Sequence, residues 1–202
     1  MINRRNFVGG AALAAALAQA RAARSHDTAS LSLARLPLVI VDERHPESRA
    51  FAMSLARRGA ALLPLADGDV TAVWLGELSR AWQAGPVAVA GLTRPPALFV
   101  LEQLALSHGL RVVMHAEHTI GAGDVRHQVL GCAAGASPPD PRELQLLGAA
   151  WPSGMAALVA SWSGLPRASD VGTSCAGLAP APVEGTALLA SWIIAPVSTS
   201  RS

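Results

Sequence analysis

The chain has 202 residues, of which 51% are hydrophobic, and sixteen basic residues stand against fourteen acidic ones. This is enough for one domain with a sizeable core. The basic residues form no stripe or cluster, which excludes nucleic acid as a partner. Beyond the N-terminus no stretch approaches the roughly 20 apolar residues of a membrane span, so no transmembrane anchor is expected after processing.

The N-terminus has the pattern of an export signal. Adjacent Arg4 and Arg5 are followed, after one spacer, by Phe7 and an Ala-rich apolar stretch. Small residues at Ala18 and Ala20 then form an A-x-A cleavage signal. The paired arginines and the mildly apolar stretch resemble the twin-arginine class of bacterial signal peptide.

This resemblance covers residues 1–20 only. It implies that the protein folds first, is exported by the twin-arginine machinery and is periplasmic. We expect cleavage near residues 20–23, then a flexible segment at 21–35 and a single α/β domain over 36–202. Loss of the signal leaves basic and acidic residues equal in number, so the mature chain is formally neutral. An uncleaved membrane anchor is the alternative.

Strand and helix patterns alternate in the first half of this domain. The expected elements, in chain order, are a strand at 38–41, a helix at 46–59, a strand at 61–65, a helix from 69 to about 84, a strand at 87–90 and a helix at 93–107. Three strand–helix units predict a Rossmann-like βαβαβα half with a parallel sheet. Pro64 predicts that the second strand lies at an edge or ends early.

In the second half of the domain, the hydrophobic pattern no longer alternates between strands and helices. Strands at 111–120 and 125–132 flank Gly121-Ala122-Gly123-Asp124, which predicts a β-hairpin. Asp140 caps a helix that runs to about residue 150, Pro152 restarts it through 162, and residues 186–195 form a closing strand. The fold class is therefore α/β with a mixed sheet. Residues 163–184 are expected to form a long loop, which would be a lid, a binding segment or a disordered segment.

In a parallel α/β sheet, ligands bind beyond the carboxyl ends of the strands. The polar residues expected near that edge are Asp42, Asp69, Thr93, Arg94 and His115. Arg94 at a helix start predicts an anion site, because its guanidinium would add to free backbone amides. The alternative is structural: Thr93 caps the helix, Arg94 is solvated, and the two aspartates are caps and turn formers.

The hairpin places two histidines together. A tight turn sets His118 directly opposite His127, with β-carbons about 4.5–5.5 Å apart, close enough for both imidazoles to bind one metal. The same register pairs Met114 with Gly131. Glu117 points to the other face, so a third metal ligand would come from elsewhere. A hydrogen-bonded structural pair, or a different register, is the alternative.

Two cysteines, Cys132 and Cys175, complete the candidate groups. In an oxidising compartment an even pair suggests a disulfide. Two buried thiols, or a reactive Cys175, are the alternatives.

No dinucleotide fingerprint, Walker loop or nucleophile elbow occurs in the chain. With the export signal, this favours a non-catalytic ligand-binding protein or an accessory partner of a periplasmic, possibly redox, system. The expected partners are the export machinery, a periplasmic protein and an anionic small molecule; the sequence names no cofactor. The alternative is a small cofactor- or metal-dependent enzyme with its site at the carboxyl ends of the parallel strands.

Overall fold

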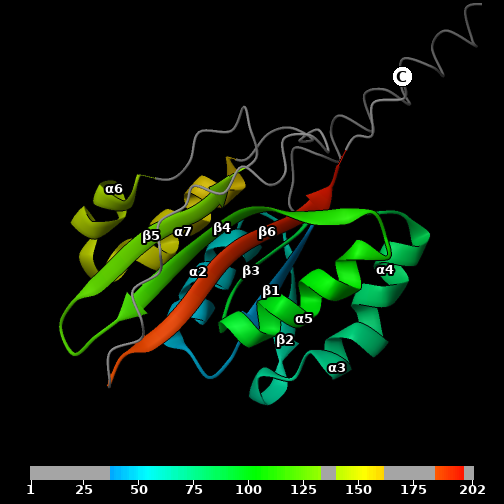
Figure 1. Cartoon of the computed structure of the whole chain (residues 1–202), viewed down its shortest axis with the longest axis horizontal. Helices are drawn as coiled ribbons and strands as arrows, with labels where there is room; N and C mark the ends of the chain where they lie inside the picture. The colour runs from blue at the N-terminus through cyan, green and yellow to red at the C-terminus, as the bar shows by residue number, and fades with distance from the viewer. Residues whose placement is uncertain (1–36, 133–139, 162–184, 198–202) are drawn as a thin grey trace, which may run out of the picture. The chain divides into compact units, whose positions relative to one another are not determined.

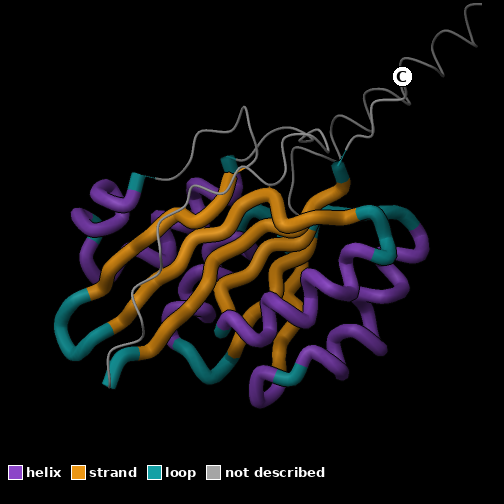
Figure 2. The backbone as a smooth tube through the Cα atoms, viewed as in Figure 1, coloured by secondary structure: helices purple, strands orange, loops and turns teal. Residues whose placement is uncertain are grey.

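The computed structural model describes residues 37–132, 140–161 and 185–197. They form the α/β domain that the sequence predicts, with a six-stranded mixed sheet and helices on both faces (Figure 1, Figure 2). The expected signal peptide, the segment at 21–35, the loop at 163–184 and Cys175 lie outside the described residues. No helix in the described ranges is long and apolar enough to cross a membrane.

The parallel half forms because three apolar runs alternate with helices. β1 (Leu38–Asp42) pairs in parallel with β2 (Ala61–Leu65) on one side and with β3 (Val89–Thr93) on the other. As Pro64 predicts, β2 is an edge strand, where a missing backbone donor costs no ladder hydrogen bond.

The helices of this half begin at the expected signals. α2 (Pro46–Ala56) starts at a proline, and α5 (Pro95–Leu106) starts at two. The helix between β2 and β3 is continuous from α3 (Val70–Val73) through a π-helical stretch (Trp74–Leu78) to α4 (Ser79–Ala84). Asp69 caps it, because its carboxylate accepts a hydrogen bond from the Thr71 amide at 2.8 Å.

The third strand differs from the prediction. It was expected at 87–90 with a turn over the next three residues, yet Gly91, Leu92 and Thr93 are buried strand residues. The reason is tertiary. Gly91 pairs with Trp192 of the last strand and leaves room for its indole ring, so a glycine that suggested a turn serves a close packing contact.

The second half adds three antiparallel strands. They are β4 (Leu110–Ile120), β5 (Val125–Cys132) and β6 (Ala187–Pro196). The sheet order is β2-β1-β3-β6-β4-β5, so the last strand of the chain lies between β3 and β4 and is antiparallel to both. Between β5 and β6 come α6 (Pro141–Leu146), a 3₁₀ turn (Gly148–Ala150) and α7 (Trp151–Ala160).

Two layers of helices bury the two faces of the sheet (Figure 1). α2, α6 and α7 pack on one face around Phe51, Trp151 and Met155. α3, α4 and α5 pack on the other around Trp82, Leu101 and Trp192. His118 and Ser191 are buried with the first layer, among otherwise apolar side chains.

The hairpin register is as predicted near the turn and wrong beyond it. His118 pairs with His127, and Ala116 with Val129. Beyond them Met114 pairs with Cys132 instead of Gly131, because Leu130 is an extra residue on β5 that makes a β-bulge. Sequence alternation alone cannot locate such a bulge.

We expect Gly91→Ala to lower the free energy of unfolding by about 1–3 kcal/mol, because the new methyl group would overlap the buried Trp192 ring. Gly131→Ala is the matched control in another strand, since a methyl group there meets nothing within 4 Å. Urea unfolding of the two variants measures the difference. Equal stabilities would show that the Gly91–Trp192 contact does not restrain β6.

Candidate functional site

A chain of hydrogen bonds crosses the sheet from β6 to the hairpin. His118 on β4 is 0% exposed, and both of its ring nitrogens have partners. Its Nδ1 lies 2.8 Å from Nδ1 of His127 on β5, and its Nε2 lies 2.8 Å from Oγ of Ser191 on β6. The three residues come together because β4 pairs with both neighbouring strands and places them on one face.

Trp151 covers this chain from the helical layer. It is the first residue of α7, where the following proline fixes the helix start. Its ring centre is 4.3 Å from that of His118 and 5.0 Å from that of His127. Trp151 therefore covers both imidazoles on one side, and His118 is fully buried while His127 stays partly exposed at the pocket.

Burial keeps the imidazoles of His118 and His127 uncharged at neutral pH. Burial lowers the pKa of His118 well below its ordinary value, and proximity to His127 and His115 lowers it further. Burial also lowers the pKa of His127, partly opposed by the Asp124 carboxylate. Each ring then carries one N–H and one lone pair.

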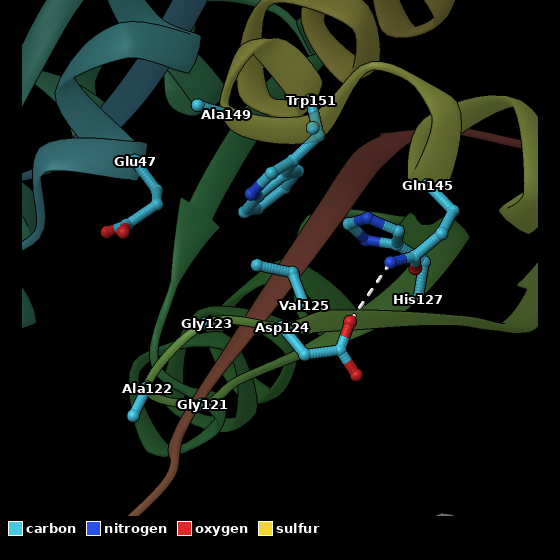
Figure 3. Close-up of a pocket in the computed structure, with 11 residues that line it drawn as sticks. Glu47, Gly121, Ala122, Gly123, Asp124, Val125, His127, Gln145, Ala149 and Trp151 are labelled. Carbon is cyan, nitrogen blue, oxygen red and sulfur yellow. Dashed lines mark hydrogen bonds between the residues drawn. The ribbon is translucent and has the colours of Figure 1, made fainter.

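A pocket of about 520 Å³ lies beside His127, where the series of hydrogen bonds ends (Figure 3). Its walls come from the start of α2, the hairpin turn, α6 and the start of α7. The lining residues are Glu47, Gly121, Ala122, Gly123, Asp124, Val125, His127, Gln145, Gly148, Ala149 and Trp151.

Several polar groups in this pocket have no hydrogen-bond partner among the described residues, and the indole N–H of Trp151 is one of them. Two others are the carboxylate of Glu47 and Nε2 of His127, which lie on either side of Trp151 in Figure 3. Asp124, by contrast, accepts a hydrogen bond from Gln145 at 3.1 Å and lies 3.5 Å from the Arg126 guanidinium. The Glu47 and His127 side chains are both partly exposed, and a concave site with a few convergent polar groups is a candidate for ligand binding.

Two residues predicted at the carboxyl ends of the parallel strands already have partners in the protein. Asp42 is buried and accepts two hydrogen bonds from the Arg44 side chain, at 2.8 and 2.7 Å. Burial raises its pKa, but the bonds from Arg44 outweigh this and leave the pKa below its ordinary value. Thr93 is buried and accepts a hydrogen bond from the Trp192 indole at 3.1 Å.

The other three predicted residues occupy separate places. Asp69 is the exposed cap of α3, and the bond from the Thr71 amide lowers its pKa. Arg94, itself the N-cap of α5, is exposed. His115 pairs with Trp192 on the sheet face opposite His118, and its Nε2 is buried without a partner among the described residues. Burial lowers its pKa.

The histidine pair fits a direct hydrogen bond better than a bridging metal. Two imidazole nitrogens bound to one tetrahedral zinc at about 2.0–2.1 Å would lie roughly 3.3 Å apart. The observed 2.8 Å is a hydrogen-bond distance. The described part of the chain also holds no group of three or more His, Cys, Asp or Glu side chains arranged to bind a metal ion.

Several residues of this site were not found from the sequence, chiefly Glu47, Asp124, Trp151 and Ser191. Glu47 and Asp124 resemble ordinary helix-start and turn residues, and Trp151 resembles a core residue. Ser191 lies 73 positions from His118. The alternation of β6 predicts which of its residues share a face, but only the strand order shows what that face meets.

No known protein family, curated protein or solved structure matches this chain. The chemistry of the site is therefore inferred from its own residues.

We expect stability to fall as the pH drops below about 6.5. The lowered pKa values of His118 and His127 mean that the unfolded chain binds more protons than the folded one, so stability is full above that pH and is lost on acidification toward the folded-state values. Each histidine contributes at most about 1.4 kcal/mol per pH unit.

His118→Gln tests this, because glutamine keeps hydrogen-bonding capacity but does not titrate. Urea unfolding between pH 7.5 and 5 should show a shallower decline than in the wild type. The residual slope belongs to His127 and His115, whose pKa values burial also lowers. An unchanged slope would contradict the buried, uncharged state of His118.

Proposed function

We propose that this is an exported, non-catalytic protein that binds a small polar molecule in the pocket between the hairpin turn, α2, α6 and α7. The observation that carries the proposal is the pocket of about 520 Å³, in whose walls the Glu47 carboxylate and Nε2 of His127 have no partner among the described residues. A single domain of this kind would act as a carrier or as the accessory partner of another periplasmic, possibly redox, protein.

The charges of the lining indicate the kind of ligand. Glu47 and Asp124 are acidic, and none of the described residues that line the pocket is an arginine. Arg126 neutralises part of the Asp124 charge from the pocket's edge. This pocket therefore favours a neutral or cationic molecule, in contrast to the anion expected beside Arg94.

A binding role is supported over the alternative enzyme. The predicted enzyme site relied on Asp42, Asp69, Thr93, Arg94 and His115 around the carboxyl ends of the parallel strands, and the structure places Asp69, Arg94 and His115 apart from one another. Asp42 and Thr93 there are already engaged by Arg44 and Trp192, so neither offers a free group to a substrate. The pocket of the histidine pair is elsewhere, at the hairpin.

Native mass spectrometry of the protein purified from the envelope of its own host tests ligand binding. We expect extra mass from a small molecule on the wild type. Glu47→Ala should lower its occupancy at least about tenfold, because a hydrogen bond to a charged group contributes roughly 1.5–3 kcal/mol.

Glu77→Gln is the control, since Glu77 is an exposed residue of the opposite helical layer. It should retain the ligand. A bare wild-type polypeptide, or equal occupancy in all three proteins, would contradict binding in this pocket.

The same spectrum tests export. The resemblance of residues 1–20 to a twin-arginine signal supports a mature mass that begins at residue 21 or 23. Replacing Arg4 and Arg5 together by lysine keeps the charge but removes the paired arginines, so the mature form should disappear from the envelope. An envelope protein with the mass of residues 1–202 would contradict cleavage.

A further inference from the structure

We infer that Ser191 and His118 fix the tautomer of His127, so that the pocket presents Nε2–H of His127 as a hydrogen-bond donor to an acceptor oxygen of the ligand. Ser191 and His118 would be positioning residues, because neither lines the pocket. The ligand half of this inference rests on the proposed function. The tautomer half is a property of the free protein.

The two hydrogen bonds of His118 restrict the position of its ring proton. A neutral imidazole has one N–H and one lone pair, so one ring nitrogen donates and the other accepts. Two arrangements satisfy both 2.8 Å contacts. In the first, Ser191 donates to Nε2 of His118, and Nδ1–H of His118 donates to His127. In the second, Nε2–H of His118 donates to Ser191, and Nδ1–H of His127 donates to Nδ1 of His118.

Ser191 distinguishes the two arrangements. In the second, Nε2–H of His118 donates to Oγ of Ser191, and the serine O–H needs an acceptor elsewhere. Ser191 is 0% exposed, and among the described residues its hydroxyl has no hydrogen-bond partner except His118. A buried donor without a partner disfavours that arrangement by roughly 5- to 150-fold.

The first arrangement determines what His127 offers. Its Nδ1 accepts the bond from His118, so its single proton is on Nε2, the nitrogen that has no partner among the described residues. An N–H group donates to a carbonyl, hydroxyl or ether oxygen and has no lone pair for a metal ion. The ligand therefore places an acceptor oxygen at His127 and a donor or cation at Glu47.

Long-range ¹H–¹⁵N NMR of the full chain at neutral pH identifies the tautomers directly. We expect protonated Nε2 and bare Nδ1 in His127, and protonated Nδ1 and bare Nε2 in His118. The opposite pattern in the wild type would overturn the inference.

Ser191→Ala removes the group that distinguishes the arrangements. We expect the two His127 tautomers to approach equal populations, while Ser191→Thr, which keeps the hydroxyl, retains the wild-type pattern. If Ser191→Ala keeps a single His127 tautomer, Ser191 does not fix it. The wild-type spectrum remains decisive if either variant fails to fold.

Two matched probes test the ligand half. Trimethylamine N-oxide carries an acceptor oxygen and no donor, and tetramethylammonium is a cation of similar size without an acceptor. We expect only the N-oxide to shift the Nε2 resonance of His127. A larger shift with tetramethylammonium, or none with the N-oxide, would overturn this half. Because neither measurement uses the natural ligand, their failure is distinct from a bare native mass, which would refute the proposed function.

Discussion

The insertion of β6 between β3 and β4 is the constraint on which the rest of the structure depends. The last strand joins the parallel half of the sheet to the hairpin, because it pairs with β3 on one side and with β4 on the other. It is antiparallel to both. On one face it brings Trp192 against Gly91 and Thr93. On the other it brings Ser191 to His118. One strand thus completes both the hydrophobic core and the series of hydrogen bonds that leads from Ser191 to His127.

Ser191, His118 and His127 can lie in an apolar layer because their polar groups form hydrogen bonds with one another. His118 is fully buried, and an unpaired imidazole there would carry the desolvation penalty of a buried polar group. Hydrogen bonds to Ser191 and His127 remove that penalty without a net charge. This series of hydrogen bonds ends at the pocket, where Nε2 of His127 has no partner among the described residues. The His127 ring therefore belongs both to the buried hydrogen bonds and to the pocket wall.

Local patterns predicted the elements and the nearest pairings. Buried strands, proline helix starts and the Asp69 cap follow from the physical chemistry of short segments. The pairing of His118 with His127 follows from the tight turn that precedes it. The prediction was wrong at Gly91 and at Met114, where a contact with Trp192 and a bulge at Leu130 override the local signal.

The sequence by itself determined the fold class and the facing histidines, because each depends on residues close along the chain or on backbone chemistry. Only the tertiary structure decided that Asp42 and Thr93 are engaged by Arg44 and Trp192. It also placed a pocket beside the hairpin, which the sequence did not predict. The reason is that strand order joins residues far apart in the chain, and no local periodicity records which strands become neighbours.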